Sequence, residues 1–119
     1  MNKKVVLNKN SQFRRLYSKG KSSVQPSVVV YAKRNGFSYN RIGLTVRKKI
    51  GKAVTRNLVK RRLRAVFRDC GEMIKTGYDF VLVSRVRTPV VRYDRLKADF
   101  IAAIKEVGAF SEIENAENE

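Results

Sequence analysis

Apolar residues recur at helical spacing in three stretches of the chain, and each stretch predicts an amphipathic helix. The predicted helices span residues 9–19, 55–70 and 93–107. In the middle helix, a helical wheel places the buried stripe at Val59, Leu63, Val66, Phe67 and Cys70. Ser11 and Thr55 are candidate N-caps, and Gly20, Gly71 and Gly108 lie where the helices would end.

Shorter apolar runs predict strands at residues 28–32 and 78–83, which are rich in β-branched and aromatic side chains. Residues 41–47 alternate instead, so that one face is apolar and the other carries Arg41 and Arg47. Asn35-Gly36 predicts the turn that joins the first two strands, and residues 48–52 form a basic loop. The polar segment 20–27 predicts a loop in which a further strand could lie.

The order of these elements is helix, strand, strand, helix, strand, helix, which favours an α+β domain with helices packed on one sheet. Residues 41–78 have the pattern of a β-α-β unit, whose crossover is ordinarily right-handed. We expect a single domain over residues 1–108. Residues 109–119, rich in Glu, are expected to form a disordered acidic tail.

The charge of the chain is distributed very unevenly along the sequence. Residues 1–68 contain 20 Lys or Arg and no Asp or Glu, whereas residues 69–119 have a formal charge of −3. The whole chain therefore has a charge of +17, and self-repulsion of this size weakens a compact fold unless a polyanion neutralises it. Such a density of cations predicts a surface that binds many phosphates, as nucleic-acid-binding proteins have.

The residue inventory excludes several kinds of catalytic site. The chain has no histidine and only one cysteine, Cys70, which lies in the predicted buried stripe. His-dependent nucleophiles, His general bases and His-ligated metals are excluded, and no internal disulfide can form. The first carboxylate is Asp69, so a metal site built by this chain has almost no ligands. We expect no catalytic residue and no metal ligand in this chain.

No apolar run approaches the length of a membrane span, so we expect no membrane association. The apolar run near the amino terminus is also too short for a signal peptide, and a cytoplasmic location is therefore expected.

The middle helix carries a cationic row opposite its buried stripe. The row consists of Asn57, Arg61, Arg64 and Arg68, spaced i, i+4, i+7 and i+11, over about 16 Å. An ordinary solvated face is the alternative, but such faces mix charges of both signs, and this one has no acid near its first members. The helix also has five Arg to one Lys, and the planar guanidinium suits phosphate. We interpret the row as a phosphate-binding surface.

Aromatic side chains near basic residues form a second candidate site. Phe13 and Tyr17 lie one turn apart in the first helix and Tyr31 lies on a strand, where they could stack on unpaired bases. The alternative is that they fill the core. Spacing alone favours a core position for Phe13, and it supports the two interpretations equally for Tyr17 and Tyr31.

The stretch from Arg41 to Phe67 contains the pattern Arg-Asn-x-x-Lys-Arg-x-x-Arg, preceded by Lys-Lys-Ile-Gly. The matching residues are Arg56, Asn57, Lys60, Arg61 and Arg64. With this signature the sequence closely resembles the protein subunit of bacterial ribonuclease P, over roughly residues 8–107. Tyr17, where phenylalanine is frequent, and Arg62 are small departures, and the acidic tail is no part of the pattern.

The resemblance implies a two-layer α/β sandwich with a four-stranded sheet, three helices and a left-handed β-α-β crossover. It also implies that a partner RNA is the catalytic centre. That RNA binds Mg²⁺ and removes the 5′ leader of precursor tRNA, and this chain assists as an accessory subunit. The implied partners are the catalytic RNA and precursor tRNA, with no obligatory protein partner.

The resemblance assigns residues to two surfaces. The signature helix would contact the catalytic RNA through Arg56, Asn57, Lys60, Arg61, Arg64 and Arg68. A cleft between the first helix and the sheet would hold the leader, and its residues are Phe13, Tyr17, Tyr31, Arg47 and Lys48. Further phosphate contacts are expected at Lys49, Lys52, Arg14 and Arg15. The rival interpretations are a structural ribosomal protein or RNA chaperone, and a protein nuclease that acts without RNA.

Overall fold

The computed structural model describes residues 6–111. Its helices are α1 (Asn10–Lys19), α2 (Ala53–Asp69) and α3 (Tyr93–Glu106), and its strands are β1 (Lys21–Val24), β2 (Val28–Arg34), β3 (Arg41–Thr45) and β4 (Tyr78–Ser84). Two short 3₁₀ turns, Lys48–Ile50 and Gly71–Met73, flank α2. The three predicted helices and three predicted strands are all present. The further strand that could lie in segment 20–27 is also present, as β1.

The four strands form one mixed sheet in the order β1-β2-β4-β3. The pairs β1/β2 and β2/β4 are antiparallel, whereas β3 and β4 are parallel neighbours joined through α2. The α+β class and the β-α-β unit are therefore confirmed. All of β4 is buried, as expected for a strand with neighbours on both sides and helices on both faces.

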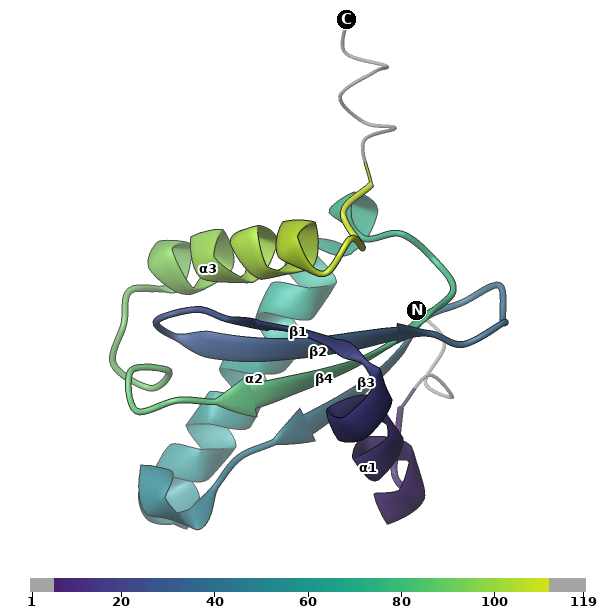
Figure 1. Cartoon of the computed structure of the whole chain (residues 1–119). Coiled ribbons are helices and arrows are strands. Elements are labelled where there is room, and N and C mark those ends of the chain that lie inside the picture. Colours follow the sequence, from purple (N-terminus) through teal and green to yellow (C-terminus); the bar gives the residue numbers. More distant parts are fainter. Residues whose placement is uncertain (1–5, 112–119) are drawn as a thin grey trace, which may run out of the picture.

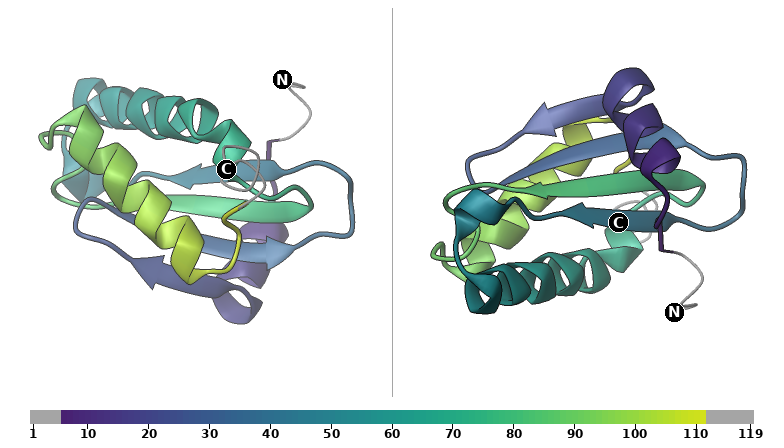
Figure 2. Two further views of the ribbon diagram at one scale, coloured as in Figure 1. Left: turned by 90° about the horizontal axis from the view of Figure 1, so that it is seen from above. Right: turned by 90° about the horizontal axis from the view of Figure 1, so that it is seen from below.

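Helices lie on both faces of the sheet. The larger core forms where α2 and α3 pack on one face, with Leu63 and Phe100 against Phe80 and Leu82. On the opposite face α1 packs through Leu16 over Val81 and Val83 of β4 (Figures 1 and 2). The expected two layers are present, and α1 adds a partial third layer.

Helix α1 starts one residue before the predicted cap Ser11. The side chain of Gln12 explains this start, because its Oε1 accepts hydrogen bonds from the backbone N–H groups of Asn8 and Lys9, both at 3.0 Å. The helix ends at Gly20, where a Cβ atom would lie 2.7 Å from the Leu16 carbonyl oxygen and 2.9 Å from that of Ala32. Glycine is therefore required for α1 to end so close to β2.

Helix α2 starts at Ala53, two residues before the predicted cap Thr55. Strand β3 ends at Thr45, before the predicted Arg47, because the chain turns there towards the 3₁₀ turn Lys48–Ile50. At the other end of the chain, Ala109 is buried and the Ser111 N–H donates to the Met73 carbonyl at 2.7 Å. The rest of the expected acidic tail, residues 112–119, lies outside the described residues.

Candidate nucleic-acid interface

The wheel prediction for α2 is confirmed on its buried side. Val59, Leu63, Val66 and Cys70 are fully buried and Phe67 is nearly so. Burial raises the pKa of the Cys70 thiol, which identifies it as an unreactive packing residue. With this stripe held against the sheet and α3, the opposite side of α2 must face solvent.

That outer side carries the predicted cationic row. Asn57, Lys60, Arg61, Arg64 and Arg68 are all exposed. Among the described residues the only carboxylate within ion-pair distance of the row is Asp69, 3.4 Å from Arg68, and this pair is itself exposed. An exposed pair of this kind contributes little stability, so the row remains available to an anionic partner.

Two arginines of α2 have structural contacts instead. Arg56, a predicted RNA contact, is half-buried and donates to the Gly51 carbonyl at 2.8 Å, which ties the basic loop to the helix. Arg62 donates through Nη1 to the Pro89 carbonyl at 2.9 Å and through Nη2 to the Val91 carbonyl. Arg62 therefore anchors the loop between β4 and α3.

The remaining basic residues of this region surround the start of α2. All four are exposed: Arg47 lies directly before the 3₁₀ turn, Lys48 and Lys49 lie in it, and Lys52 is the N-cap residue of α2. The free N–H groups and positive dipole end of a helix add to the attraction that such a cluster has for anions. The cluster lies close in the chain to the first turn of α2, so it extends the cationic surface of that helix.

On the other face, the register of the sheet explains what α1 covers. Tyr31, Val81 and Gly43 form one row of residues across β2, β4 and β3. Phe13 packs so closely on this row that a Cβ atom added at Gly43 would lie 2.6 Å from the end of the Phe13 ring. The absence of a side chain at Gly43 is what lets α1 lie against the sheet.

The two predicted aromatic residues Tyr17 and Tyr31 are brought together on one flank of α1. Their ring centroids are 4.9 Å apart with an angle of 74° between the planes, which is an edge-to-face contact. The Tyr17 hydroxyl also lies 2.6 Å from the Thr45 Oγ1, a hydrogen bond that links α1 to β3. Tyr17 is 41% exposed, whereas Phe13 and Tyr31 are half-buried.

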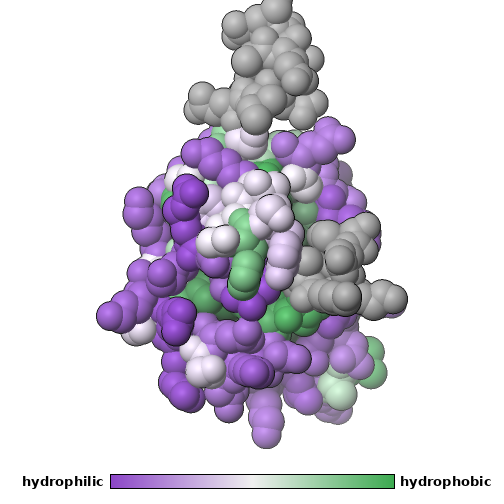
Figure 3. Space-filling model, turned by 90° about the vertical axis from the view of Figure 1, so that its right-hand side faces the viewer, coloured by the Kyte–Doolittle hydropathy of each residue, from purple (hydrophilic) through white to green (hydrophobic). Residues whose placement is uncertain are grey.

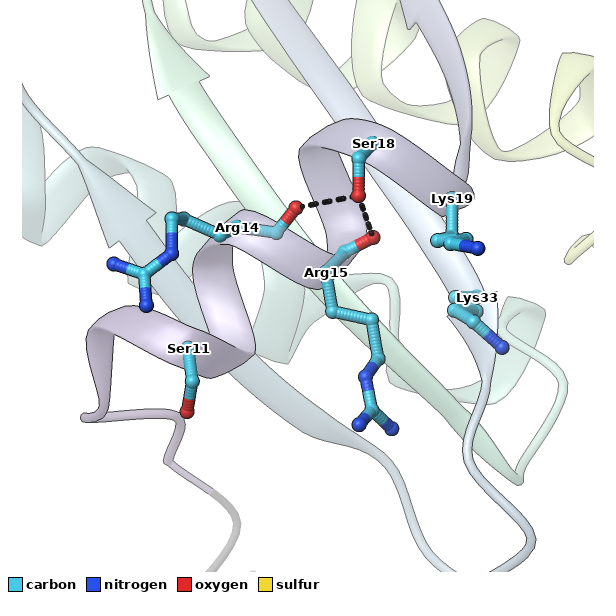
Figure 4. A pocket seen from close by; sticks show the side chains of 6 residues that line it. All are labelled: Ser11, Arg14, Arg15, Ser18, Lys19 and Lys33. Atoms are coloured by element: carbon cyan, nitrogen blue, oxygen red, sulfur yellow. Dashed lines mark hydrogen bonds between the residues drawn. The ribbon is translucent and has the colours of Figure 1, made fainter.

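Phe13 therefore fills part of the core between α1 and the sheet, and at the same time borders the exposed Tyr17. Arg47, two residues beyond Thr45, has its backbone N–H bonded to the Ser84 Oγ at 3.3 Å and its side chain exposed. Of the expected cleft residues, Phe13, Tyr17 and Tyr31 are thus brought together between α1 and the sheet, whereas Arg47 and Lys48 follow the end of β3. Arg15 lies on the same side of α1 as Lys19 and Lys33, whereas the side chain of Arg14 extends away from them (Figure 4).

Sequence reasoning expected a phosphate contact at Arg15 but missed the other basic groups on the second flank of α1. Arg15 and Lys19 lie there, one turn apart, beside a row of the sheet formed by Lys33, Asp79 and Arg41. The spacing of the helical residues could have indicated this flank. The strand residues could not have been found, because their proximity depends on which strands are neighbours.

The described residues contain few groups suited to catalysis. Within residues 6–111, no cluster of three His, Cys, Asp or Glu side chains has the arrangement that would hold a metal ion. No helix in the same part of the chain is long and apolar enough to cross a membrane. The arrangement is that of a binding surface, with exposed cations on α2 and an exposed aromatic ring, that of Tyr17, on α1 beside the half-buried Tyr31 of β2.

Comparison with known proteins gives one consistent result. The family model of ribonuclease P matches residues 1–108. The ribonuclease P protein component of Natranaerobius thermophilus is 39% identical over 105 residues, covering 88% of this chain and 91% of that protein. That of Clostridioides difficile is 43% identical over 86 residues, covering 71% and 75%.

Solved structures agree with the sequence relatives. The ribonuclease P protein of Staphylococcus aureus superposes with a TM-score of 0.79 at 29% identity, covering 90% of this chain and 98% of that one. The Thermotoga maritima protein gives a TM-score of 0.74 at 30% identity, with 81% and 91% covered. With the family signature on α2 and the same three-helix, four-stranded fold, the chain belongs to the bacterial ribonuclease P protein component family, whose members are subunits of an endoribonuclease that processes the 5′ ends of tRNA.

Proposed function

We propose that this chain is the RNA-binding accessory subunit of ribonuclease P, in which the RNA subunit performs the chemistry. In this proposal the exposed row of α2 binds the catalytic RNA through Asn57, Lys60, Arg61, Arg64 and Arg68, with Arg56 at its start. The basic cluster of Arg47, Lys48, Lys49 and Lys52 and the residues Arg14 and Arg15 add phosphate contacts. The main support for the proposal is the exposed cationic row. In the described part of the chain, the only carboxylate that forms an ion pair with this row is that of Asp69.

The aromatic flank of α1 is proposed to hold the single-stranded 5′ leader of precursor tRNA. An exposed ring such as that of Tyr17 presents a surface on which an unpaired base can stack, and Tyr31 supports it from the sheet. Phe13 forms the inner wall of this site, and Arg47 and Lys48 can neutralise leader phosphates. Binding of the leader would raise affinity for the precursor over the mature tRNA.

Mg²⁺ belongs to the RNA in this proposal. The chain has no histidine, so it has few of the ligands that a metal site of its own would use. Its cations would instead lower the repulsion between RNA phosphates and so help the RNA to retain Mg²⁺. A single RNA-binding domain and a left-handed β3–α2–β4 crossover, both implied by the family resemblance, are part of the same proposal.

A cleavage assay tests the accessory role. Precursor tRNA and Mg²⁺ are mixed with the catalytic RNA alone, with this chain alone and with both. We expect no cleavage by the chain alone, and cleavage at a lower Mg²⁺ concentration when the chain joins the RNA. Cleavage by the chain alone would identify a protein nuclease, and no effect on the RNA-catalysed reaction would favour a ribosomal protein or an RNA chaperone.

A binding assay tests the leader site. Tyr17→Ala and Tyr31→Ala should each weaken binding of precursor tRNA to the assembled enzyme by about 1 to 3 kcal/mol, and leave binding of mature tRNA unchanged. Tyr39→Ala is a matched control, because Tyr39 is 43% exposed but lies in the loop between β2 and β3. Equal losses for precursor and mature tRNA would indicate a folding defect and contradict the assignment.

A further inference from the structure

The flank of α1 opposite Tyr17 faces a groove, and the proposed function uses only Arg14 and Arg15 of its lining, as further phosphate contacts. Three hollows, of about 510, 290 and 320 Å³, adjoin one another along this flank. The first shares Arg15 with the second, and it shares Lys19 and Lys33 with the third, so the three form one continuous groove. We call it the α1 groove, and the basic residues that line it are Lys9, Arg14, Arg15, Lys19, Lys21, Lys33, Arg34 and Arg41.

The register of the sheet explains the floor of the α1 groove. Lys33, Asp79 and Arg41 lie side by side on β2, β4 and β3, one row away from the row that α1 covers. Asp79 is the only carboxylate that lines the groove, and it is buried. Arg41 binds both of its oxygens, at 2.8 and 2.7 Å, and Asn35 donates a further hydrogen bond at 2.9 Å.

Because Arg41 neutralises Asp79, the other cations of the groove keep their charge unopposed. Within residues 6–111, no carboxylate lies within ion-pair distance of Arg15, Lys19 or Lys33. These three side chains extend on the same side of α1, whereas Arg14 points to the other side (Figure 4). The surrounding surface is mostly hydrophilic at the end of the molecule that Figure 3 shows.

The chemistry of the groove differs from that of the aromatic flank. No aromatic side chain lines the hollows at Arg15, where the polar partners are the hydroxyls of Ser11 and Ser18. Cations and hydroxyls contact phosphate and sugar, but they offer no ring on which an unpaired base could stack. Helix α1 also lies between the groove and the aromatic flank, so a leader strand held at Tyr17 does not enter the groove.

We propose that the α1 groove binds the phosphodiester backbone of a base-paired segment of the ribonuclease P RNA. The chain would then contact its RNA subunit on both faces of the sheet, through α2 on one face and through the α1 groove on the other. This proposal rests on the RNA subunit being a partner, as the proposed function does, but it needs neither the α2 row nor the leader site.

The test measures binding of the chain to the catalytic RNA across a series of salt concentrations. The variant combines Arg15→Gln and Lys33→Gln, and the control combines Arg87→Gln and Arg95→Gln, which removes the same charge from exposed positions that line none of the three hollows. We expect the groove variant to lower the slope of log affinity against log salt by about 1.4 to 1.8, which corresponds to two lost phosphate contacts. The control should leave the slope unchanged.

A second measurement separates the possible occupants. The ratio of affinities for precursor and mature tRNA should be the same for the groove variant and the unmodified assembled enzyme. A slope equal to that of the control would overturn the proposal, and so would a loss confined to the precursor, which would place the leader in the groove. Lys33→Gln alone, with half the expected effect, replaces the double variant if circular dichroism shows that the latter is unfolded.

The result is independent of the α2 row and of the leader site, which the groove variant leaves intact. An Arg61→Ala variant that lowers the salt slope while the groove variant does not would contradict the groove and leave the α2 surface intact. The opposite pattern would contradict the α2 surface and leave the groove intact.

Discussion

Arg61 and Arg62 are adjacent and identical in chemistry, yet their surroundings differ completely. Arg61 is exposed in the cationic row, whereas Arg62 is half-buried and bonded to the carbonyls of Pro89 and Val91. One residue corresponds to 100° of rotation around a helix, which is enough to move a side chain from an open face to a packed one. Function at the residue scale therefore depends on helical position more than on residue type.

This pair yields a prediction about salt dependence. Arg61→Ala should lower the salt slope of RNA binding by about 0.7 to 0.9 and barely change stability, because it removes one phosphate contact from an exposed site. Arg62→Ala should leave the slope unchanged and reduce the free energy of unfolding by about 1 to 3 kcal/mol, because two carbonyls lose their donor. Filter binding and urea unfolding measure the two quantities. Identical behaviour of the two variants would be inconsistent with the structure.

Tyr93 gives a prediction about pH. Burial, together with the hydrogen bond that its hydroxyl donates to Asp69 at 2.6 Å, raises the pKa of Tyr93 to about 12. An unfolded tyrosine has a pKa of about 10, so the folded state holds this proton more tightly. The resulting stabilisation is fully present below pH ~10 and is lost as the pH rises through about 12. A phenolate absorbance titration should show one late component that disappears in Tyr93→Phe.

At the scale of elements, a buried polar network ties three segments together. Asp99 of α3 accepts hydrogen bonds from the Ser27 N–H at 3.1 Å and from the Ser27 hydroxyl at 2.7 Å. The Thr88 hydroxyl donates to the Ser27 carbonyl at 2.7 Å, which joins the loop after β4 to the same point. The sequence could not predict this network, because its partners are 61 and 72 residues apart in the chain.

Removing Asp99 should therefore be costly although it lies far from either RNA surface. Asp99→Ala leaves the buried Ser27 donors without an acceptor, and we expect the free energy of unfolding to fall by about 1 to 3 kcal/mol. Asp94→Ala on the same helix is the control, because its pair with Arg92 is exposed and should contribute less than about 1 kcal/mol. A loss for Asp99→Ala no greater than for Asp94→Ala in urea unfolding would show that the network contributes nothing.

At the scale of the whole molecule, the fold gives acidic and basic side chains different surroundings. Among the acids of the described residues, Asp79 is held by Arg41, Asp99 by Ser27 and Asp69 by Tyr93. The lysines and arginines of residues 6–68 lie mostly exposed on α1, β2 and α2, on both faces of the sheet. These acids therefore already have hydrogen-bond partners within the protein, whereas most of the cations remain free to bind an external polyanion.

This separation predicts that anions stabilise the free chain. A net charge of +17 repels itself, and at about 0.1 M salt charges more than roughly 10 Å apart are screened from one another. The melting temperature should rise as sodium chloride is added, and micromolar polyphosphate should raise it further by binding the folded state. Thermal unfolding followed by circular dichroism measures both effects. A melting temperature independent of either anion would contradict the prediction.

Features that repeat with a local period are predictable from the amino-acid sequence alone. The buried stripe and cationic row of α2 follow from the 3.6-residue period, and the apolar face of β3, with Ile42 and Leu44, follows from the period of two. The signature residues from Arg56 to Arg64 lie on consecutive turns of one helix, so their identification needed no knowledge of packing. The role of Arg56 as a tie to Gly51 was beyond the sequence, because it depends on the loop before the helix.

Contacts between residues far apart in the chain, by contrast, depend on how the elements pack. The strand order β1-β2-β4-β3 places Lys33 and Arg41 on either side of Asp79, and the packing of α1 on Gly43 brings Tyr17 to Tyr31. Both arrangements depend on strand pairings and helix contacts between segments far apart in the chain. Local patterns encode which face of an element is apolar, but the choice of neighbour is made by the packing of the whole core.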